Sequence, residues 1–121
     1  MRRPVVAVAV LLGVLTLSAC GSSSSAGDAN LLPTKVIDIS FKGTTISPNG
    51  TDIDVAVGQR IEFDVTADKP GEIHVHSSPE EQEFEYDTGS NTFQVKPISA
   101  PGQVVVESHT LNKTLFTLVA R

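Results

Sequence analysis

Histidine is the residue type in this sequence that best suits metal chemistry, and the chain has 3 of them. His74 and His76 stand two positions apart, and His109 follows a second run of alternating apolar residues. On an extended strand the side chains alternate between the two faces, so the imidazoles of His74 and His76 lie on one face. If the fold brings His109 to the same place, three imidazoles converge. Imidazole groups on convergent strands are typical ligands of copper and zinc ions.

A carboxylate accompanies this candidate set. Glu107 has the same parity as His109 at the end of the strand expected over residues 103–107, which predicts that both side chains share a face. Glu107 is then either a further ligand or a group that orients an imidazole. The alternative is that the paired histidines are solvent-facing polar residues, because the apolar residues beside them take the core side. The sequence leaves both interpretations open.

Other chemistries find less support. An acidic run could supply oxygen ligands or bind a basic partner, but it lacks the spacing of a calcium loop and is interpreted as a solvated strand face; it comprises Glu80, Glu81, Glu83, Glu85 and Asp87. Ser108 and His109 are adjacent, so on a strand they point to opposite faces and cannot act as nucleophile and base. The sequence therefore predicts no enzyme. A formal net charge of -5 also argues against nucleic-acid binding.

The elements that must position these residues are short strands. After Pro33 the apolar residues alternate with polar ones in short runs separated by Gly, Pro and Asn turns. No window shows sustained helical periodicity. The pattern predicts an all-β antiparallel sandwich or barrel of six to eight strands. Gly58-Gln59, between two clean alternations, has the signature of a hairpin turn.

The N-terminal residues indicate export rather than a fold. Arg2 and Arg3 precede an apolar run, Val5–Leu17, which is shorter than the roughly 20 residues of a membrane span. The run ends in Leu17-Ser18-Ala19-Cys20-Gly21, which resembles the bacterial lipoprotein box. The resemblance implies a signal peptide over residues 1–19, a lipid on the Cys20 sulfur, and a Ser/Gly-rich flexible tether over residues 20–32. The folded domain, residues 33–121, would then lie outside the cytoplasmic membrane and be anchored to it.

The order of motifs within residues 36–119 resembles the cupredoxin fold, especially the small cupredoxin-like lipoproteins of actinobacteria. The matching segments are Phe41-Lys42-Gly43, Val57-Gly58-Gln59-Arg60-Ile61-Glu62-Phe63, Glu72-Ile73-His74-Val75-His76 and the closing Pro101–His109. The resemblance implies a Greek-key β-sandwich. It also implies one histidine ligand on the strand that matches residues 73–76, and a Cys, a second His and usually a Met after the strand that matches residues 103–107.

The sequence departs from that pattern at the ligands. Ser108 stands where the Cys would be expected, and residues 33–121 contain no Cys or Met. A type 1 blue copper centre requires a thiolate, so that centre and its type of electron transfer are excluded. The fold can be inherited while its cofactor chemistry is not.

We therefore expect a non-enzymatic, membrane-anchored lipoprotein of the cell envelope that acts as a binding or interaction module. One alternative is a copper or zinc carrier that uses His74, His76 and His109, with Glu107 as a further candidate ligand, without a thiolate. Another is a structural accessory domain that binds an envelope protein through a sheet face or edge. The metal, the partner and the oligomeric state are not defined by the sequence.

Overall fold

A computed structural model describes residues 32–121, which form a sandwich of β-strands. The expected signal peptide, Cys20 and nearly all of the tether lie outside these residues. The strands are β1 (Lys35–Lys42), β2 (Thr45–Ser47), β3 (Thr51–Val55), β4 (Ile61–Ala67), β5 (Gly71–Val75), β6 (Gln82–Tyr86), β7 (Gly89–Val95), β8 (Gly102–Ser108) and β9 (Lys113–Ala120). Within residues 32–121 there is no helix of the length and apolar character that crossing a membrane requires.

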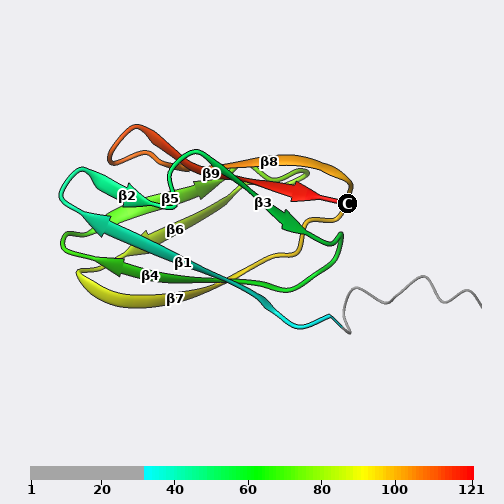
Figure 1. The fold of residues 1–121 in the computed structure, drawn as a ribbon, viewed down its shortest axis with the longest axis horizontal. Coiled ribbons are helices and arrows are strands. Elements are labelled where there is room, and N and C mark those ends of the chain that lie inside the picture. The colour runs from blue at the N-terminus through cyan, green and yellow to red at the C-terminus, as the bar shows by residue number, and fades with distance from the viewer. Residues whose placement is uncertain (1–31) are drawn as a thin grey trace, which may run out of the picture.

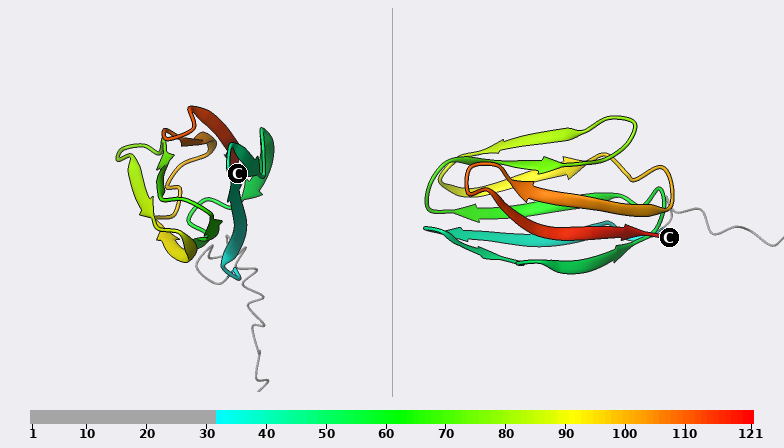
Figure 2. Two further views of the ribbon diagram at one scale, coloured as in Figure 1. Left: turned by 90° about the vertical axis from the view of Figure 1, so that its left-hand side faces the viewer. Right: turned by 90° about the horizontal axis from the view of Figure 1, so that it is seen from above.

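Two sheets form the layers of the sandwich (Figure 1). The smaller sheet has the strand order β2-β1-β4-β7, and the larger sheet has the order β3-β9-β8-β5-β6. Most neighbouring strands are antiparallel, but β1 and β4 pair in parallel, as do β3 and β9. Seen along the strands, the two sheets surround one common interior (Figure 2).

The all-β sandwich expected from the sequence is confirmed, and two of its details differ. The described residues form nine strands rather than six to eight, because the three-residue β2 was not recognised, and two of the pairings are parallel. The hairpin expected at Gly58-Gln59 is wrong. β3 pairs with β9 and β4 with β1 and β7, so this segment crosses from one sheet to the other. The Gln59 side chain stabilises the crossing by accepting a hydrogen bond from Ala56 N at 2.9 Å and donating one to Pro33 O at 2.9 Å.

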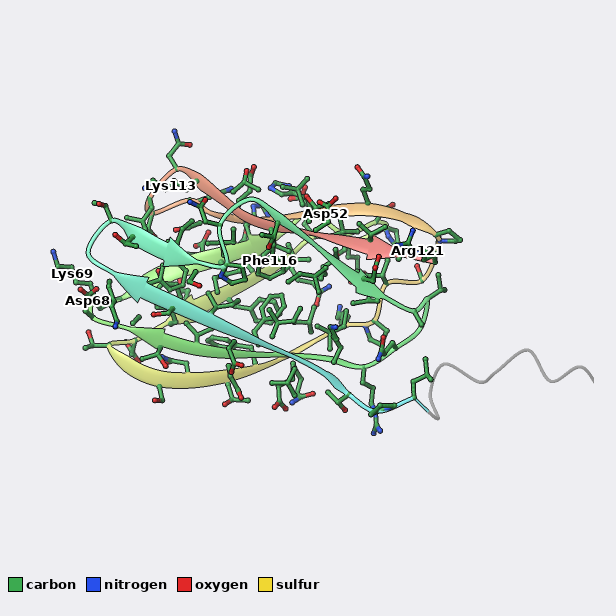
Figure 3. The ribbon with its side chains drawn as sticks, viewed as in Figure 1. Asp52, Asp68, Lys69, Lys113, Phe116 and Arg121 are labelled. Carbon is green, nitrogen blue, oxygen red and sulfur yellow. The ribbon has the colours of Figure 1, made fainter. Side chains whose placement is uncertain are left out.

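The interior consists of the inward-facing residues of both sheets. In β4 every second residue is buried, including Phe63, as the period of a strand predicts. Phe63 meets Phe116 of β9 edge to face, with ring centroids 5.7 Å apart, which is a favoured arrangement for two aromatic rings. Figure 3 places Phe116 midway along the sandwich. This core holds the strands that carry the histidines in one register.

The two ends of the sandwich differ in what they carry. Residue 32 and the C-terminus lie at the same end (Figure 1). β9 begins at Lys113, near the other end, and is followed by Arg121 at the first end (Figure 3). Because Ser108 pairs with Lys113, His109 lies at the end opposite to the point where the chain enters the domain.

Candidate metal centre

The histidines lie on the outer face of the larger sheet, over β8, β5 and β6. β5 is an inner strand of this sheet, and Ile73 and Val75 take its core side with no exposed surface. His74, between them, therefore points away from the interior. Its neighbours across the sheet are Glu107 on β8 and Glu83 on β6. The register of these three strands thus places imidazoles and carboxylates side by side on one sheet face, and we call this group of side chains the grid.

His74 is at the centre of this grid and is buried although it faces outward. Only 6% of its surface is exposed, because its neighbours cover it. Its Nδ1 lies 3.0 Å from Nε2 of His109, a distance at which one ring donates a hydrogen bond to the other. Its Nε2 lies 3.0 Å from Glu81 Oε2 and 3.6 Å from Glu83 Oε1. Among residues 32–121 these two carboxylates are what this buried nitrogen faces.

His76 lies between two carboxylates. It follows β5 and continues its pairing, since its backbone N–H donates to Val105 O at 2.9 Å. Its Nδ1 is 3.2 Å from Glu81 Oε1, and its Nε2 is 3.0 Å from Glu107 Oε2. Partial burial acts to lower the pKa of His76, but the hydrogen bonds and charges of Glu81 and Glu107 outweigh it and raise the pKa above its ordinary value. The hydrogen bond from His76 lowers the pKa of Glu81.

His109 completes the cluster from the loop after β8. Its Nδ1 lies 3.8 Å from Glu72 Oε1, and the next residue, Thr110, accepts a hydrogen bond from Glu72 N at 3.1 Å. One ring nitrogen from each of His74, His76 and His109 lies within 4.8 Å of the others. The three side chains singled out in the sequence are therefore brought together, from two strands and a loop.

Glu107 also lies in this cluster, on the face that its parity predicts. It contacts His76, and its other oxygen accepts a 3.4 Å hydrogen bond from the Thr114 hydroxyl. The expectation that the paired histidines face away from the core is correct, but His74 is covered rather than solvent-exposed and lies on an inner strand.

Sequence reasoning did not place Glu72, Glu81 and Glu83 at the histidines. The acidic run was interpreted as a solvated face, and two of its members contact imidazoles. Two others do not take part: Glu80 pairs with Lys96 at 2.8 Å, and Glu85 lies opposite Glu72. The contact follows from the register of β5 and β6, which places Glu83 opposite His74 and which sequence spacing does not determine.

Ser108, where the resemblance places a thiolate, points to the other side of the sheet. It is completely buried, lies opposite Ile73, and its Oγ accepts a hydrogen bond from Leu111 N at 3.2 Å. Ser108 also forms a hydrogen bond with the Tyr86 hydroxyl. Burial raises the pKa of Tyr86, and the hydrogen bond with Ser108, which acts to lower it, does not outweigh burial. The imidazoles therefore lie on the opposite face of the sheet from the position expected for the blue-copper Cys.

The donor atoms of the cluster define what it can bind. Its groups are imidazole nitrogens and carboxylate oxygens, which suit Cu(II) and Zn(II). The chain has one Cys, Cys20, which lies outside the described residues, so the cluster does not have the composition of a typical type 1 copper site. The residues present fit a copper ion of another type.

Comparison with solved structures relates this fold to cupredoxins. A reduced Cu(I) form of an amicyanin variant aligns with a TM-score of 0.54 over 77% of this chain and 89% of its own, at 8% identity. A purple cupredoxin from Nitrosopumilus maritimus gives 0.54 over 72% and 99%, at 12% identity. Reduced auracyanin from Roseiflexus castenholzii gives 0.52 over 72% and 97%, at 13% identity. No protein-family model and no curated protein matches the sequence.

At these identities the likeness shows the fold. The chain is a cupredoxin-like β-sandwich. It carries an imidazole and carboxylate cluster on the outside of its larger sheet.

Proposed function

We propose that this chain is a lipid-anchored protein of the cell envelope that binds a divalent copper or zinc ion at the cluster of His74, His76 and His109. The observation that carries the proposal is the convergence of these three rings, whose nitrogens lie within 4.8 Å of one another. The role is binding or carriage rather than catalysis. Ser108, the hydroxyl next to a histidine in the sequence, lies on the opposite side of the sheet from the imidazoles.

Burial of His74 favours a metal site over an exposed polar surface. Its covered nitrogen, Nε2, faces the carboxylates of Glu81 at 3.0 Å and Glu83 at 3.6 Å. Two negative groups at one buried imidazole exceed the single positive charge that a proton on the ring would supply. A divalent ion held by this nitrogen and the carboxylates would balance their charge.

The composition of the cluster favours a divalent ion. Carboxylate oxygens lie within 3.2 Å of ring nitrogens on both His74 and His76, and residues 33–121 contain no sulfur ligand. Soft Cu(I) prefers thiolate or thioether ligands, whereas Cu(II) and Zn(II) accept nitrogen with oxygen. The negative charge of the carboxylates also offsets the charge of the ion.

The place of the cluster in the domain fits an anchored protein. A lipid on Cys20 would hold the domain at the end where residue 32 lies, and His109 lies at the opposite end. The cluster is on an outer sheet face and remains partly open, since the His76 and His109 side chains are 34% and 51% exposed. An ion outside the cytoplasmic membrane could then reach it.

Calorimetric titration of the purified protein with Cu(II) and Zn(II) tests the metal site. We expect one ion per chain and much weaker binding by His76→Ala. The matched control is Glu85→Gln, on the same strand face as Glu83 but opposite Glu72 rather than a histidine, and it should bind as the unchanged chain does. Binding by the unchanged chain that is no tighter than by His76→Ala would contradict the metal site. The domain would then be an interaction module, and capture of its envelope partner from membranes becomes the next experiment.

Membrane fractionation tests the anchor separately. A single acyl chain binds a bilayer only marginally, whereas a lipidated Cys with several chains anchors stably. We expect the unchanged protein in the membrane fraction and Cys20→Ala in the soluble fraction. Retention of Cys20→Ala on the membrane would contradict lipidation at this residue.

A further inference from the structure

The two nitrogens of His74 have different surroundings. Nδ1 faces Nε2 of His109 at 3.0 Å and is satisfied by it. Nε2 is buried and, among the residues that the structure describes, faces carboxylate oxygens rather than another ring. Of the two nitrogens, Nε2 is therefore the one that can share an ion with carboxylates.

Two carboxylates face His74 Nε2. Glu81 Oε2 lies 3.0 Å from it and Glu83 Oε1 lies 3.6 Å from it. The second oxygen of Glu81 lies 3.2 Å from Nδ1 of His76. The Glu81 carboxylate thus faces His74 Nε2 and His76 Nδ1, and the Glu83 carboxylate faces His74 Nε2.

The opposite nitrogen of each ring has a partner of its own. His74 Nδ1 meets His109, and His76 Nε2 meets Glu107 Oε2 at 3.0 Å. Histidines that bind a metal almost always donate their second N–H to a carboxylate or another acceptor, which sets the tautomer and orients the ring. His109 and Glu107 occupy the positions of such partners.

The facing atoms are within a few tenths of an ångström of the spacing that one ion requires. Two ligand atoms bound to zinc at about 2.0–2.2 Å and separated by a tetrahedral angle lie about 3.3–3.6 Å apart. The contacts between the ring nitrogens and the carboxylate oxygens are 3.0, 3.2 and 3.6 Å. Small rotations of the two glutamates, whose side chains are 58% and 64% exposed, are enough to admit an ion.

We propose that the ion is bound by His74 Nε2, His76 Nδ1 and the carboxylates of Glu81 and Glu83, while His109 and Glu107 are positioning residues that hold the two imidazoles. This assignment rests on the proposed function and deepens it. Two nitrogens and two or more oxygens suit Zn(II) and Cu(II) and disfavour Cu(I). The site is thus selective for divalent ions.

The competing assignment places the ion among all three rings, at His74 Nδ1, His109 Nε2 and one nitrogen of His76. It would give Glu81 and Glu83 no role at the ion. The two assignments predict different numbers of bound imidazoles, two in the first and three in the second.

Electron paramagnetic resonance of the Cu(II)-loaded protein counts these imidazoles. We expect hyperfine coupling to two ring nitrogens, and the same spectrum for His109→Gln, whose side-chain oxygen can still accept the proton of His74 Nδ1. Three coupled nitrogens in the unchanged protein, with one lost in His109→Gln, would overturn the assignment.

Zinc affinity tests the carboxylates. Loss of a group that supports a ligand typically weakens metal binding 10–100-fold. We expect Glu107→Gln in that range, and Glu81→Gln to weaken binding more than Glu107→Gln does. Glu85→Gln is the control and should change nothing. Equal affinities of Glu81→Gln and Glu85→Gln would overturn the role of Glu81. Failure of the proposed function looks different, because the unchanged protein would then bind neither ion.

Discussion

At the scale of single residues, His76 is the histidine whose pKa the cluster moves upward. Burial acts to lower this pKa, but Glu81 and Glu107 each accept a hydrogen bond from the ring and together raise the pKa by more than burial lowers it. With a raised folded-state pKa, this interaction stabilises the metal-free protein fully below about pH 6.5, and the gain is lost as the pH rises through that pKa. We predict that Glu107→Gln lowers the pKa of His76, measured by NMR titration of the imidazole protons.

Glu80 supplies the control for that titration. It is also a carboxylate of the acidic run, but its pKa is lowered by the hydrogen bond from Lys96 and not by a histidine. Glu80→Gln should leave the His76 titration in place. A His76 pKa that moves equally in Glu80→Gln and Glu107→Gln would show that overall charge, rather than the 3.0 Å contact, sets it.

The sequence predicted which side chains share a face but not which side chains touch. The period of two placed His74 and His76 together, and Glu107 with His109, because alternation is a local property. The contacts of Glu81 and Glu83 depend on how β5 pairs with β6, which depends on where the intervening loop turns. Sequence spacing does not determine that register.

At the scale of the elements, the hairpin of β5 and β6 depends on close packing at Gly71. A Cβ at this position would lie 2.3 Å from the Tyr86 hydroxyl oxygen and 2.6 Å from the ring carbon that bears it. Tyr86 is buried and stacked on Phe41 with ring centroids 4.6 Å apart, so it has little room to move. We predict that Gly71→Ala lowers the free energy of unfolding by about 1–3 kcal/mol, measured by urea denaturation.

A double-mutant cycle identifies the cause. Tyr86→Leu removes both the hydroxyl and the ring carbon with which the new Cβ collides, so Gly71→Ala should cost less in that background than in the unchanged protein. An identical cost in both backgrounds would place the effect in the backbone of residue 71 and contradict the collision.

Strand positions were predictable because alternation and turn residues are local, whereas the assignment of strands to sheets was not. The turn at Gly58-Gln59 has the composition of a hairpin, yet β3 and β4 belong to different sheets. Parallel partners such as β1 and β4 are separated by other strands in the sequence, and their pairing is decided by the shared core. The local sequence therefore predicts where a strand begins and ends, but it does not predict which strand lies beside it in the sheet.

At the scale of the whole molecule, the candidate metal site lies on the outer face of the larger sheet, away from the interior of the sandwich. The sandwich is cupredoxin-like, and Ser108, where the sequence resemblance implies a thiolate, is buried between the sheets. The imidazoles lie across the sheet from it, on the outer face. The interior is packed with apolar side chains, and the proposed metal binding would depend on the register of β8, β5 and β6.

Metal binding should therefore stabilise the whole domain. An ion that binds only the folded state adds about 2.7 kcal/mol at a concentration of 100 times its dissociation constant. For a domain of this size that gain raises the melting temperature by about 10 °C or more. We predict such a shift with Zn(II) at pH 8, a small shift with Mg(II), which prefers all-oxygen sites, and a reduced shift in His76→Ala.

The shift should also fall as the pH falls. Imidazole must be neutral to bind an ion, and the raised pKa of His76 means that protons compete with zinc already above pH 6.5. We therefore expect the Zn(II)-induced rise in melting temperature to be large at pH 8 and small at pH 5.5, followed by scanning calorimetry at both values. A rise of the same size at both would mean that zinc is bound by carboxylates alone, and the imidazoles of this sheet face would then not be its ligands.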